Sequence, residues 1–338
     1  MRVAVTGATG SLGGALIAEF KKFNPGSLTG VVSLSRDEVK AAELGEHHAD
    51  WPPLKCMLGD VRDERRLEEV FRGCQAVIHA AALKRVDETA YSPEELVKTN
   101  VQGTINVIRA AAEVGVRKVV VVSSDKAVEA TNAYGMSKAM AESYAVQSNA
   151  YTVPRGTRVS CVRYGNVLGS RGSVVHVWRR ALREGRPLRL TDLGMTRFII
   201  TLPQAAQFVL GALDAMEGGE IFVPVLPAAT LGTLVEAVER EFYEGTVAER
   251  SLADGRFRHV REVVGLRPGG EKLHESLLSR EEPSRAYQHV LGCAVRPSHH
   301  SWRREWAGGY PFDRAYSSDR PDRWLTEVEL VEMLRGVA

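Results

Sequence analysis

The chain has 338 residues, 44% of them hydrophobic and 25% charged, and a formal net charge of +2. This balance is that of an ordinary globular protein, so disorder, collagen-like repeats and coiled coils are not expected. A near-neutral chain also lacks the basic excess that nucleic-acid-binding proteins usually carry. At roughly 150 residues per domain, the length predicts about two domains or one large α/β unit.

The amino-terminal sequence and the cysteines both indicate an intracellular setting. The chain begins with a strand-like apolar run, MRVAVTGATG, with no basic leader and no cleavage site. No stretch of about 18 apolar residues indicates a transmembrane helix. The cysteines lie far apart, without a CxxC pair, at Cys56, Cys74, Cys161 and Cys293. We therefore expect a soluble, cytoplasmic protein with reduced cysteines and no metal site.

Short apolar runs alternate with amphipathic stretches through the first half of the chain. The predicted elements, in order, are a strand over Arg2–Thr6, a helix over Leu12–Phe23, a strand over Gly30–Leu34, a helix over Arg65–Arg72, a strand over Ala76–His79, a helix over Pro93–Val114, a strand over Lys118–Ser123, a helix through Ser137–Gln147 and a strand over Arg158–Arg163. Continuous apolar strands that alternate with helices indicate a parallel sheet covered on both faces. The predicted fold class is therefore α/β, with a doubly wound sheet of the Rossmann type.

The regular alternation ends after about Tyr164, where short elements and Pro-Gly punctuation take over. We predict a doubly wound domain over residues 1–165 and a smaller, discontinuous domain that comprises mainly residues 166–338. The stretch Leu202–Met216 looks helical and is expected to pack back on the sheet of the first domain.

A glycine-rich loop follows the first predicted strand and opens the first helix. Glycines at its three fixed positions allow a tight turn, let backbone N–H groups approach a pyrophosphate, and permit close packing of helix on strand. The helix amino terminus adds partial positive charge. A plain turn is the alternative, but the strand–loop–helix context favours a nucleotide site. Its expected contacts are Gly7, Thr9, Gly10, Ser11, Leu12 and Gly13.

The end of the second predicted strand bears on the choice between NAD and NADP. A carboxylate there would bind the ribose 2′-hydroxyl and repel a 2′-phosphate. Here Ser35 can donate a hydrogen bond and Arg36 offers a guanidinium, whereas Asp37 comes late for the ribose role. We expect NADP rather than NAD, with a solvated charged loop as the alternative. Asp60 and Val61 fall where such folds contact the adenine edge.

Tyr134 and Lys138 are four residues apart in a predicted helix, so they share one face. A lysine ammonium in that position lowers the pKa of the phenol, which makes a phenolate usable near neutral pH. The pair follows the strand that ends at Ser123 and Ser124. This position favours a catalytic pair over a chance YxxxK match.

Together, the glycine loop, the YxxxK pair and the chain length resemble an extended short-chain dehydrogenase/reductase that acts on a nucleotide sugar. Further motifs are similar to the soluble, inverting UDP-N-acetylglucosamine 4,6-dehydratases and span nearly the whole chain. In sequence order they are SRDE from Ser35, HAAALK from His79, KTN from Lys98, SDKA from Ser124, RYGNV from Arg163, GSRGSV from Gly169, MTRF from Met195, EKLHE from Glu271 and YSS from Tyr316.

The resemblance implies a catalytic set. Tyr134 would deprotonate the sugar 4-hydroxyl, with Lys138 beside it, while a hydride passes from carbon 4 to NADP⁺. Asp125 and Lys126 would be the acid and the base that eliminate water across carbons 5 and 6, and Ser124 would bind the sugar or the phenol. These roles need a protonated Asp125 and a neutral Lys126, which burial favours. An ion pair that caps the strand end is the alternative.

The same resemblance implies binding residues. Besides the glycine loop, Ser35, Arg36, Asp60, Val61, Tyr134 and Lys138, the expected cofactor contacts are Ala80, Ala81 and Val167. The expected substrate contacts are Lys84, Asn166, Val174, Thr191 and Arg267. Lys84 and Arg267 could reach diphosphate oxygens, or could be ordinary surface cations.

Two departures from the family pattern bear on how the sugar is held. Arg85 stands where a histidine is common, and Gly270 is an extra residue in the loop that follows Arg267. Neither change removes a member of the acid–base set.

These features predict an NADP-dependent UDP-N-acetylglucosamine 4,6-dehydratase, a hydro-lyase, that inverts carbon 5 and serves surface-glycan or glycoconjugate synthesis. The expected partners are a UDP-sugar and further copies of the chain, because Pro93–Val114 and Ser137–Gln147 resemble the helices through which these enzymes dimerise. Neither nucleic acid nor membrane is expected. A UDP-hexose epimerase and a non-catalytic NADP-sensing module of the same fold are the alternatives.

Overall fold

A computed structural model describes residues 1–23, 28–84, 91–244, 260–266, 270–299, 302 and 310–337. The chain divides into two units. Unit 1 comprises Met1–Tyr164, Pro203–Val225 and Leu277–Ala315, and unit 2 comprises Gly165–Leu202, Leu226–Ser276 and Tyr316–Ala338.

Unit 1 is built on a nine-stranded sheet with the order β14-β15-β10-β6-β5-β4-β1-β2-β3. Its strands are β1 (Arg2–Thr6), β2 (Gly30–Ser35), β3 (Leu54–Leu58), β4 (Ala76–His79), β5 (Lys118–Val122), β6 (Arg158–Val162), β10 (Ile221–Val223), β14 (Ala286–His289) and β15 (Gly292–Val295). The run from β10 to β3 is parallel throughout. At one edge, β15 runs antiparallel to both of its neighbours, β10 and β14. This order confirms the predicted doubly wound fold.

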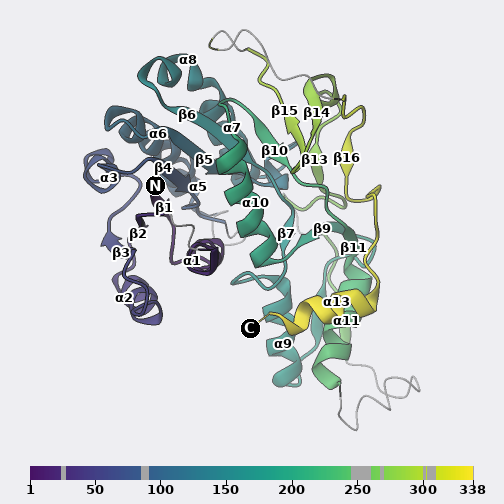
Figure 1. Ribbon diagram of the computed structural model, residues 1–338. Coiled ribbons are helices and arrows are strands. Elements are labelled where there is room, and N and C mark those ends of the chain that lie inside the picture. The colour runs from purple at the N-terminus through teal and green to yellow at the C-terminus, as the bar shows by residue number, and fades with distance from the viewer. Residues whose placement is uncertain are drawn as a thin grey trace. The chain divides into compact units, whose positions relative to one another are not determined.

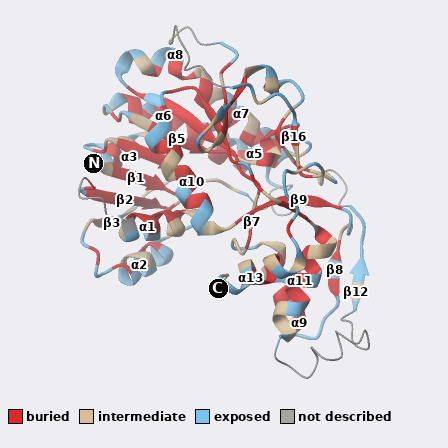
Figure 2. Ribbon diagram, turned by 45° about the vertical axis from the view of Figure 1, so that its right-hand side comes forward, coloured by how far each residue is buried: buried red, intermediate tan, exposed pale blue. Residues whose placement is uncertain are grey.

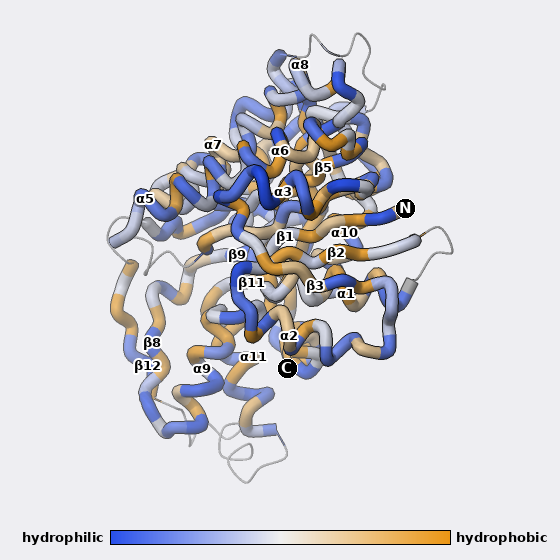
Figure 3. Tube along the Cα trace, turned by 90° about the vertical axis from the view of Figure 1, so that its left-hand side faces the viewer, coloured by the Kyte–Doolittle hydropathy of each residue, from blue (hydrophilic) through white to orange (hydrophobic). Residues whose placement is uncertain are grey.

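Helices cover both faces of this sheet. On one face lie α1 (Ser11–Phe23) and α10 (Leu202–Ala215), joined where Gln207 Nε2 donates to Glu19 Oε2 at 3.1 Å (Figure 1). The other face carries α3 (Glu64–Phe71), α6 (Gly103–Glu113) and α7 (Ala133–Gln147) (Figure 3). Because β2 and β4 are covered on both sides, every one of their residues is buried (Figure 2). Their continuous apolar sequences follow from that burial.

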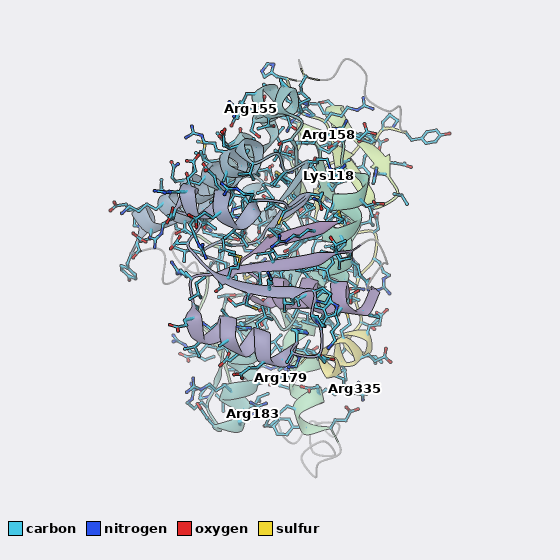
Figure 4. All side chains as sticks on the ribbon, turned by 60° about the vertical axis from the view of Figure 1, so that its left-hand side comes forward. Lys118, Arg155, Arg158, Arg179, Arg183 and Arg335 are labelled. Atoms are coloured by element: carbon cyan, nitrogen blue, oxygen red, sulfur yellow. The ribbon has the colours of Figure 1, made fainter. Side chains whose placement is uncertain are left out.

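The parallel strands all run toward the same edge of the sheet. Lys118 and Arg158, the first residues of β5 and β6, are paired in register and lie together (Figure 4). The loops that follow the other ends of these strands therefore meet at the opposite, carboxyl edge. In open α/β sheets, ligands bind at that edge, beside the point where the strand order reverses.

The predicted helix over Pro93–Val114 is not a single α-helix. It begins as α5 (Pro93–Leu96), continues as a π-helix, η1 (Val97–Gln102), and becomes α6 at Gly103. Thr104 Oγ1, in the first turn of α6, donates to the carbonyl of Asn100 in η1 at 2.6 Å. Apolar spacing predicts a helical stretch but does not distinguish i→i+5 from i→i+4 bonding, and π segments often accompany functional residues.

Two elements between β2 and β4 were not predicted. They are α2 (Glu38–His47) and β3 (Leu54–Leu58). Strand β3 lies at the edge of the sheet, and its burial is partial and irregular, so its sequence LKCML shows neither a continuous apolar run nor alternation.

Residues 277–315 belong to unit 1, although the sequence grouped them with the second domain. Cys293–Val295 of β15 pair antiparallel with Ile221–Val223 of β10, and β14 pairs with β15 in turn. The short 3-10 helix η4 (Glu282–Arg285) precedes β14. These elements are too short to carry a βαβ signal, so the sequence pattern does not reveal which sheet they join.

Unit 2 has its own apolar core, in which Trp178, Val235 and Leu330 are almost fully buried. Its elements are β7 (Asn166–Val167), α9 (Val174–Arg183), β8 (Leu188–Leu190), β9 (Thr196–Ile200), β11 (Ala228–Thr230), α11 (Leu231–Tyr243), β12 (Arg261–Val263), β16 (Tyr316–Ser317) and α13 (Glu327–Arg335), while β13 (Ser276–Leu278) lies where the units meet in the sequence. Arg179 of α9 holds the end of α13, where it donates to the carbonyls of Leu334 at 2.8 Å and Val337 at 2.9 Å (Figure 4).

Among the helices in the described ranges, none is long and apolar enough to cross a membrane.

Candidate active site

The glycine loop packs against the end of β4. Gly7 has φ +70°, and a Cβ there would lie 2.7 Å from both the Cα and the N of Ala81. A Cβ on Gly13 would lie 2.4 Å from the carbonyl oxygen of Gly7. The N–H of Gly7 donates to the carbonyl of Leu34 at 3.0 Å, which ties the loop to β2 as well. Only glycine fits at positions 7 and 13, and the amino terminus of α1 opens directly after the loop.

The residues at the end of β2 make different contacts. Ser35 is buried, and its hydroxyl bonds to that of Thr9 at 2.9 Å, which connects this strand end to the glycine loop. Asp37 caps α2, because its carboxylate accepts from the N–H of Lys40 at 3.0 Å and pairs with the Lys40 ammonium. Arg36 is exposed between them. The carboxylate that could have bound a ribose hydroxyl is thus used as a helix cap.

Asp60 and Val61 follow β3 at the same edge. The Asp60 carboxylate accepts the N–H of Arg62 at 2.9 Å and its Nη2 at 2.8 Å. Burial acts to raise the pKa of Asp60, but these bonds and the Arg62 charge outweigh it, so the pKa lies below its usual value. Val61 is buried beneath Gly103, where a Cβ would lie 2.7 Å from Val61 Cγ2. Asp60 therefore remains an anion at neutral pH.

Tyr134 and Lys138 lie in the first turns of α7, which begins at the cap Asn132. Asn132 Oδ1 accepts from the N–H of Gly135 at 2.8 Å. Both Tyr134 and Lys138 are buried. Lys138 Nζ donates to the carbonyl of Val122, at the end of β5, at 2.5 Å. Burial lowers the pKa of Lys138 to about 8, so its ammonium still predominates at neutral pH.

Asp125 is the most deeply buried member of the predicted set, with 1% of its side chain exposed. It lies with Lys126 in a 3-10 turn, η2 (Asp125–Ala127), directly after β5. Its Oδ1 accepts from Ser124 Oγ at 2.8 Å and from Lys126 Nζ at 3.2 Å. Its Oδ2 and the nearby Ser123 Oγ are buried without a hydrogen-bond partner among the described residues. Buried polar atoms left in this way call for a ligand or a water.

The turn η2 packs directly on the first turn of α7. A Cβ on Gly135 would lie 2.3 Å from the carbonyl oxygen of Lys126, so the two backbones touch at this point. The N–H of Asp125 donates to the carbonyl of Tyr164 at 3.2 Å. Burial first, and then the neighbouring Tyr134 and Asp125, raise the pKa of Tyr164 far above its ordinary value. Tyr134, Asp125 and Lys126 are therefore brought together, and Tyr164 is a neutral phenol beside them.

Asn100 is a structural residue of the site whose role the sequence did not reveal. Its Oδ1 accepts from the N–H of Leu83 at 2.8 Å, and its Nδ2 donates to the Leu83 carbonyl at 3.0 Å and to Ser137 Oγ at 3.0 Å. It thus links the segment after β4 to α7. Lys84 follows directly and is exposed. The motif KTN, which contains Asn100, was the available signal.

His79, at the end of β4, forms hydrogen bonds with two neighbouring elements. Its Nδ1 bonds to Thr6 Oγ1 at 2.7 Å and its Nε2 to Thr104 Oγ1 at 3.1 Å. Burial and then the charge of Lys138 lower its pKa to about 3. The ring is therefore neutral, and its two hydrogen bonds connect β4 to β1 and to α6.

Four of the other predicted binding residues belong to unit 2. Asn166 and Val167 form β7 and pair with Ile199 and Ile200 of β9. Val174 is the first residue of α9. Thr191 Oγ1 donates to the sulfur of Met195 at 2.9 Å. The fifth residue, Arg267, lies outside the described residues, as does Arg85.

Three motifs of the carboxy-terminal half meet inside unit 2. Thr196 Oγ1 bonds to His274 Nδ1 at 2.8 Å and to Ser318 Oγ at 2.7 Å. Tyr316 is buried, and its hydroxyl donates to the carbonyl of Leu226 at 2.8 Å. The residue types of MTRF, EKLHE and YSS are therefore explained in part by their contacts with one another.

In the described parts of the chain, no group of three or more His, Cys, Asp or Glu side chains could hold a metal ion.

A parallel sheet with this strand order, a glycine loop after β1 and a tyrosine–lysine pair on α7 together define the extended short-chain dehydrogenase/reductase class. Within that class, the family model described as polysaccharide biosynthesis protein matches residues 3–296. The chain belongs to this family.

Two activities are represented among the similar relatives. The UDP-N-acetylglucosamine 4,6-dehydratase (inverting) of Campylobacter jejuni is 34% identical over 98% of this chain and 96% of its own. The UDP-glucose 4-epimerase of Rickettsia massiliae is 38% identical over 83% of this chain and 79% of its own.

Solved structures share the fold. Pen from Bacillus thuringiensis superposes with a TM-score of 0.85 at 30% identity, covering 100% of this chain and 98% of its own. DesIV, a dTDP-glucose 4,6-dehydratase from Streptomyces venezuelae solved with NAD and TYD bound, superposes with a TM-score of 0.68 at 23% identity, covering 80% of this chain and 86% of its own.

Proposed function

We propose that this chain is an NADP-dependent UDP-N-acetylglucosamine 4,6-dehydratase that inverts carbon 5 of the sugar. One observation carries this proposal. Asp125 and Lys126 form a bonded acid–base pair in the turn that packs on Tyr134, and the second oxygen of Asp125 is buried without a partner among the described residues. Dehydration needs such a pair in addition to the tyrosine, whereas an exchange of configuration at carbon 4 does not.

A nicotinamide dinucleotide fits the residues at the carboxyl edge of the sheet. The close approach of Gly7 to Ala81 leaves a side-chain-free cradle, and the amino terminus of α1 favours a pyrophosphate. The exposed guanidinium of Arg36, together with the Ser35 hydroxyl, favours the 2′-phosphate of NADP over the bare ribose of NAD. When bound, such a cofactor takes a hydride from carbon 4 of the sugar and returns one to carbon 6.

Tyr134 serves as the base for the sugar 4-hydroxyl in this proposal. The Lys138 ammonium is fixed on the Val122 carbonyl and lies on the same face of α7 as Tyr134. A positive charge in this buried site stabilises the phenolate relative to the phenol. The phenolate can then accept the proton of the 4-hydroxyl as carbon 4 is oxidised to a ketone.

Asp125 and Lys126 together perform the elimination. The ketone at carbon 4 acidifies the hydrogen on carbon 5. Neutral Lys126 removes that hydrogen as a proton, protonated Asp125 gives its proton to the departing 6-hydroxyl, and water leaves. The products of this step are an ammonium and a carboxylate, which can pair across the 3.2 Å contact between Lys126 Nζ and Asp125 Oδ1. Because ion pair and neutral pair hold the same number of protons, one proton shift across this contact restores the reactive form.

A UDP-hexose 4-epimerase is the second candidate, because the Rickettsia massiliae relative bears that name at 38% identity. Tyr134 and Lys138 would serve either reaction. The buried Asp125 carboxyl would then be only an ion-pair partner of Lys126, with no chemistry at carbon 6.

Turnover of UDP-N-acetylglucosamine in deuterated water separates the two. We expect a product lighter by one water, a 4-keto-6-deoxy sugar nucleotide, with solvent deuterium on carbon 5, measured by mass spectrometry and NMR. An isomer of unchanged mass without deuterium would identify an epimerase. Binding of NADP without turnover of any UDP-sugar would instead indicate a non-catalytic module.

The substitution Arg36→Ala tests the cofactor preference. We expect the affinity for NADP to fall about ten- to a hundredfold and the affinity for NAD to change little, because one charge-assisted bond to the 2′-phosphate is lost. Titration of nucleotide-free protein measures both. Lys40→Ala is the matched control, since Lys40 is an exposed cation paired with Asp37. Unchanged NADP binding in Arg36→Ala would show that the loop is merely solvated.

A further inference from the structure

A buried charge network lies behind the candidate catalytic pair. Arg163, directly after β6, is 4% exposed. It donates to Glu142 of α7 from Nε at 2.8 Å and Nη2 at 2.5 Å. It also donates to Glu282 of η4 from Nη1 at 2.9 Å and Nη2 at 2.8 Å. One guanidinium thus holds two carboxylates from different segments of unit 1.

The network adjoins Lys138. Glu142 lies one helical turn after Lys138 on the same face of α7. Cys161 of β6 is buried beside this helix face, and its Sγ donates to the Glu142 carbonyl oxygen at 3.9 Å. Burial is the largest influence on the pKa of Lys138 and lowers it, whereas the charge of Glu142 acts to raise it.

The network has a net charge opposite to that of Lys138. Two carboxylates and one guanidinium leave one net negative charge, which is opposite to the Lys138 ammonium. Burial acts to raise the pKa of Glu282, but Arg163 outweighs it, so Glu282 is ionised at neutral pH. His79, on the other side of Lys138, is neutral, and burial keeps the Cys161 thiol protonated.

We propose that Glu142, Arg163 and Glu282 are positioning residues for Lys138. The surplus carboxylate of this network keeps the buried Lys138 ammonium charged, and the bonds through Arg163 fix α7 against β6. This inference rests on the proposed role of Lys138 beside Tyr134. The second carboxylate adds net negative charge where burial disfavours a cation.

The sign of the effect follows from electrostatics. Removing a negative charge near the pair lowers the affinity for protons of both Tyr134 and Lys138. Because their titrations are coupled, both apparent pKa values of the pair move down, whichever proton leaves first. Glu142→Gln and Glu282→Gln should therefore shift the titration by about half to one pH unit toward acid, with Glu142→Gln giving the larger shift.

The pair can be titrated without substrate. In the full-length protein, the phenolate absorbance of Tyr134 is isolated by subtracting the curve of the matching Tyr134→Phe variant in each background. Glu282→Asp keeps the charge and should leave the titration in place. Glu220→Gln is the matched control, because Glu220 is also buried and its carboxylate accepts from Ser160 of β6 at 2.6 Å and from the N–H of Gly218 at 2.8 Å.

A shift in both glutamine variants, with none in Glu282→Asp and Glu220→Gln, supports the proposal. An unmoved titration in folded Glu282→Gln overturns it, even if Glu142→Gln fails to fold. Equal shifts in Glu220→Gln would also overturn it, since they would show a general effect of lost stability. Because the readout needs no turnover, failure of the dehydratase assignment would appear separately, as a wild-type protein that does not convert UDP-N-acetylglucosamine.

Discussion

Tyr134→Phe is expected to lower the turnover of UDP-N-acetylglucosamine by about 10³- to 10⁴-fold, the range lost when a general base is removed. The phenyl ring fills the same buried space on α7, so folding and NADP binding should persist. Without the phenol, no group on this helix accepts the proton of the 4-hydroxyl, and oxidation at carbon 4 cannot begin. Initial rates of product formation, with NADP affinity measured alongside, test this expectation.

Tyr144→Phe is the matched control for this prediction. Tyr144 is on the same helix, but its hydroxyl bonds to that of Tyr151 rather than to the site. Its loss should change turnover by less than about twofold, within the range of an ordinary surface change. Wild-type turnover in Tyr134→Phe would refute the role assigned to Tyr134.

Lys126→Ala should block the second half of the reaction and spare the first. We expect formation of the dehydrated product to fall by about 10³-fold, because the base that removes the carbon 5 proton is lost. Oxidation at carbon 4 uses Tyr134 and Lys138, which remain in place. In a single turnover, the absorbance of reduced nicotinamide should therefore rise and persist, while the mass of the sugar nucleotide shows no loss of water.

Lys98→Ala provides the comparison for a lysine outside the site. Lys98, in η1, is half-exposed and pairs with Glu94 and Glu95 of α5, so its removal should leave both steps unchanged. If Lys126→Ala dehydrated the sugar at the wild-type rate, another residue would be the base. The Asp125–Lys126 contact would then be only an ion pair that caps β5.

The parallel sheet could be predicted because burial on both faces forces continuous apolar runs into β1, β2, β4 and β5. The edge strand β3 lacked that signal, since water reaches part of it. The apolar pattern also could not predict the π-helix η1, because a π-helix differs from an α-helix in which carbonyl each backbone N–H bonds to. The placement of residues 277–315 depends on pairing between strands far apart in the chain.

In the candidate site, too, some residues could be predicted from the sequence, and some contacts could not. Tyr134 and Lys138 are four residues apart, so helical spacing alone places them on one face. Asp125 and Lys126 were predicted from the motif SDKA. The structure adds the hydrogen bond between them and the Asp125 Oδ2 that has no partner among the described residues. The contact of Arg163 with Glu282 joins residues 119 positions apart, and no local pattern in the sequence foretells it.

In the proposed reaction, the hydrogen removed from carbon 4 returns to carbon 6 of the same sugar. UDP-N-acetylglucosamine deuterated at carbon 4 tests this most directly, mixed with substrate that carries ¹³C throughout the sugar but no deuterium. We expect a dehydrated product with deuterium on carbon 6 of the ¹²C molecules alone. Deuterium lost to water, spread to the ¹³C molecules, released as reduced cofactor or retained on carbon 4 would contradict it.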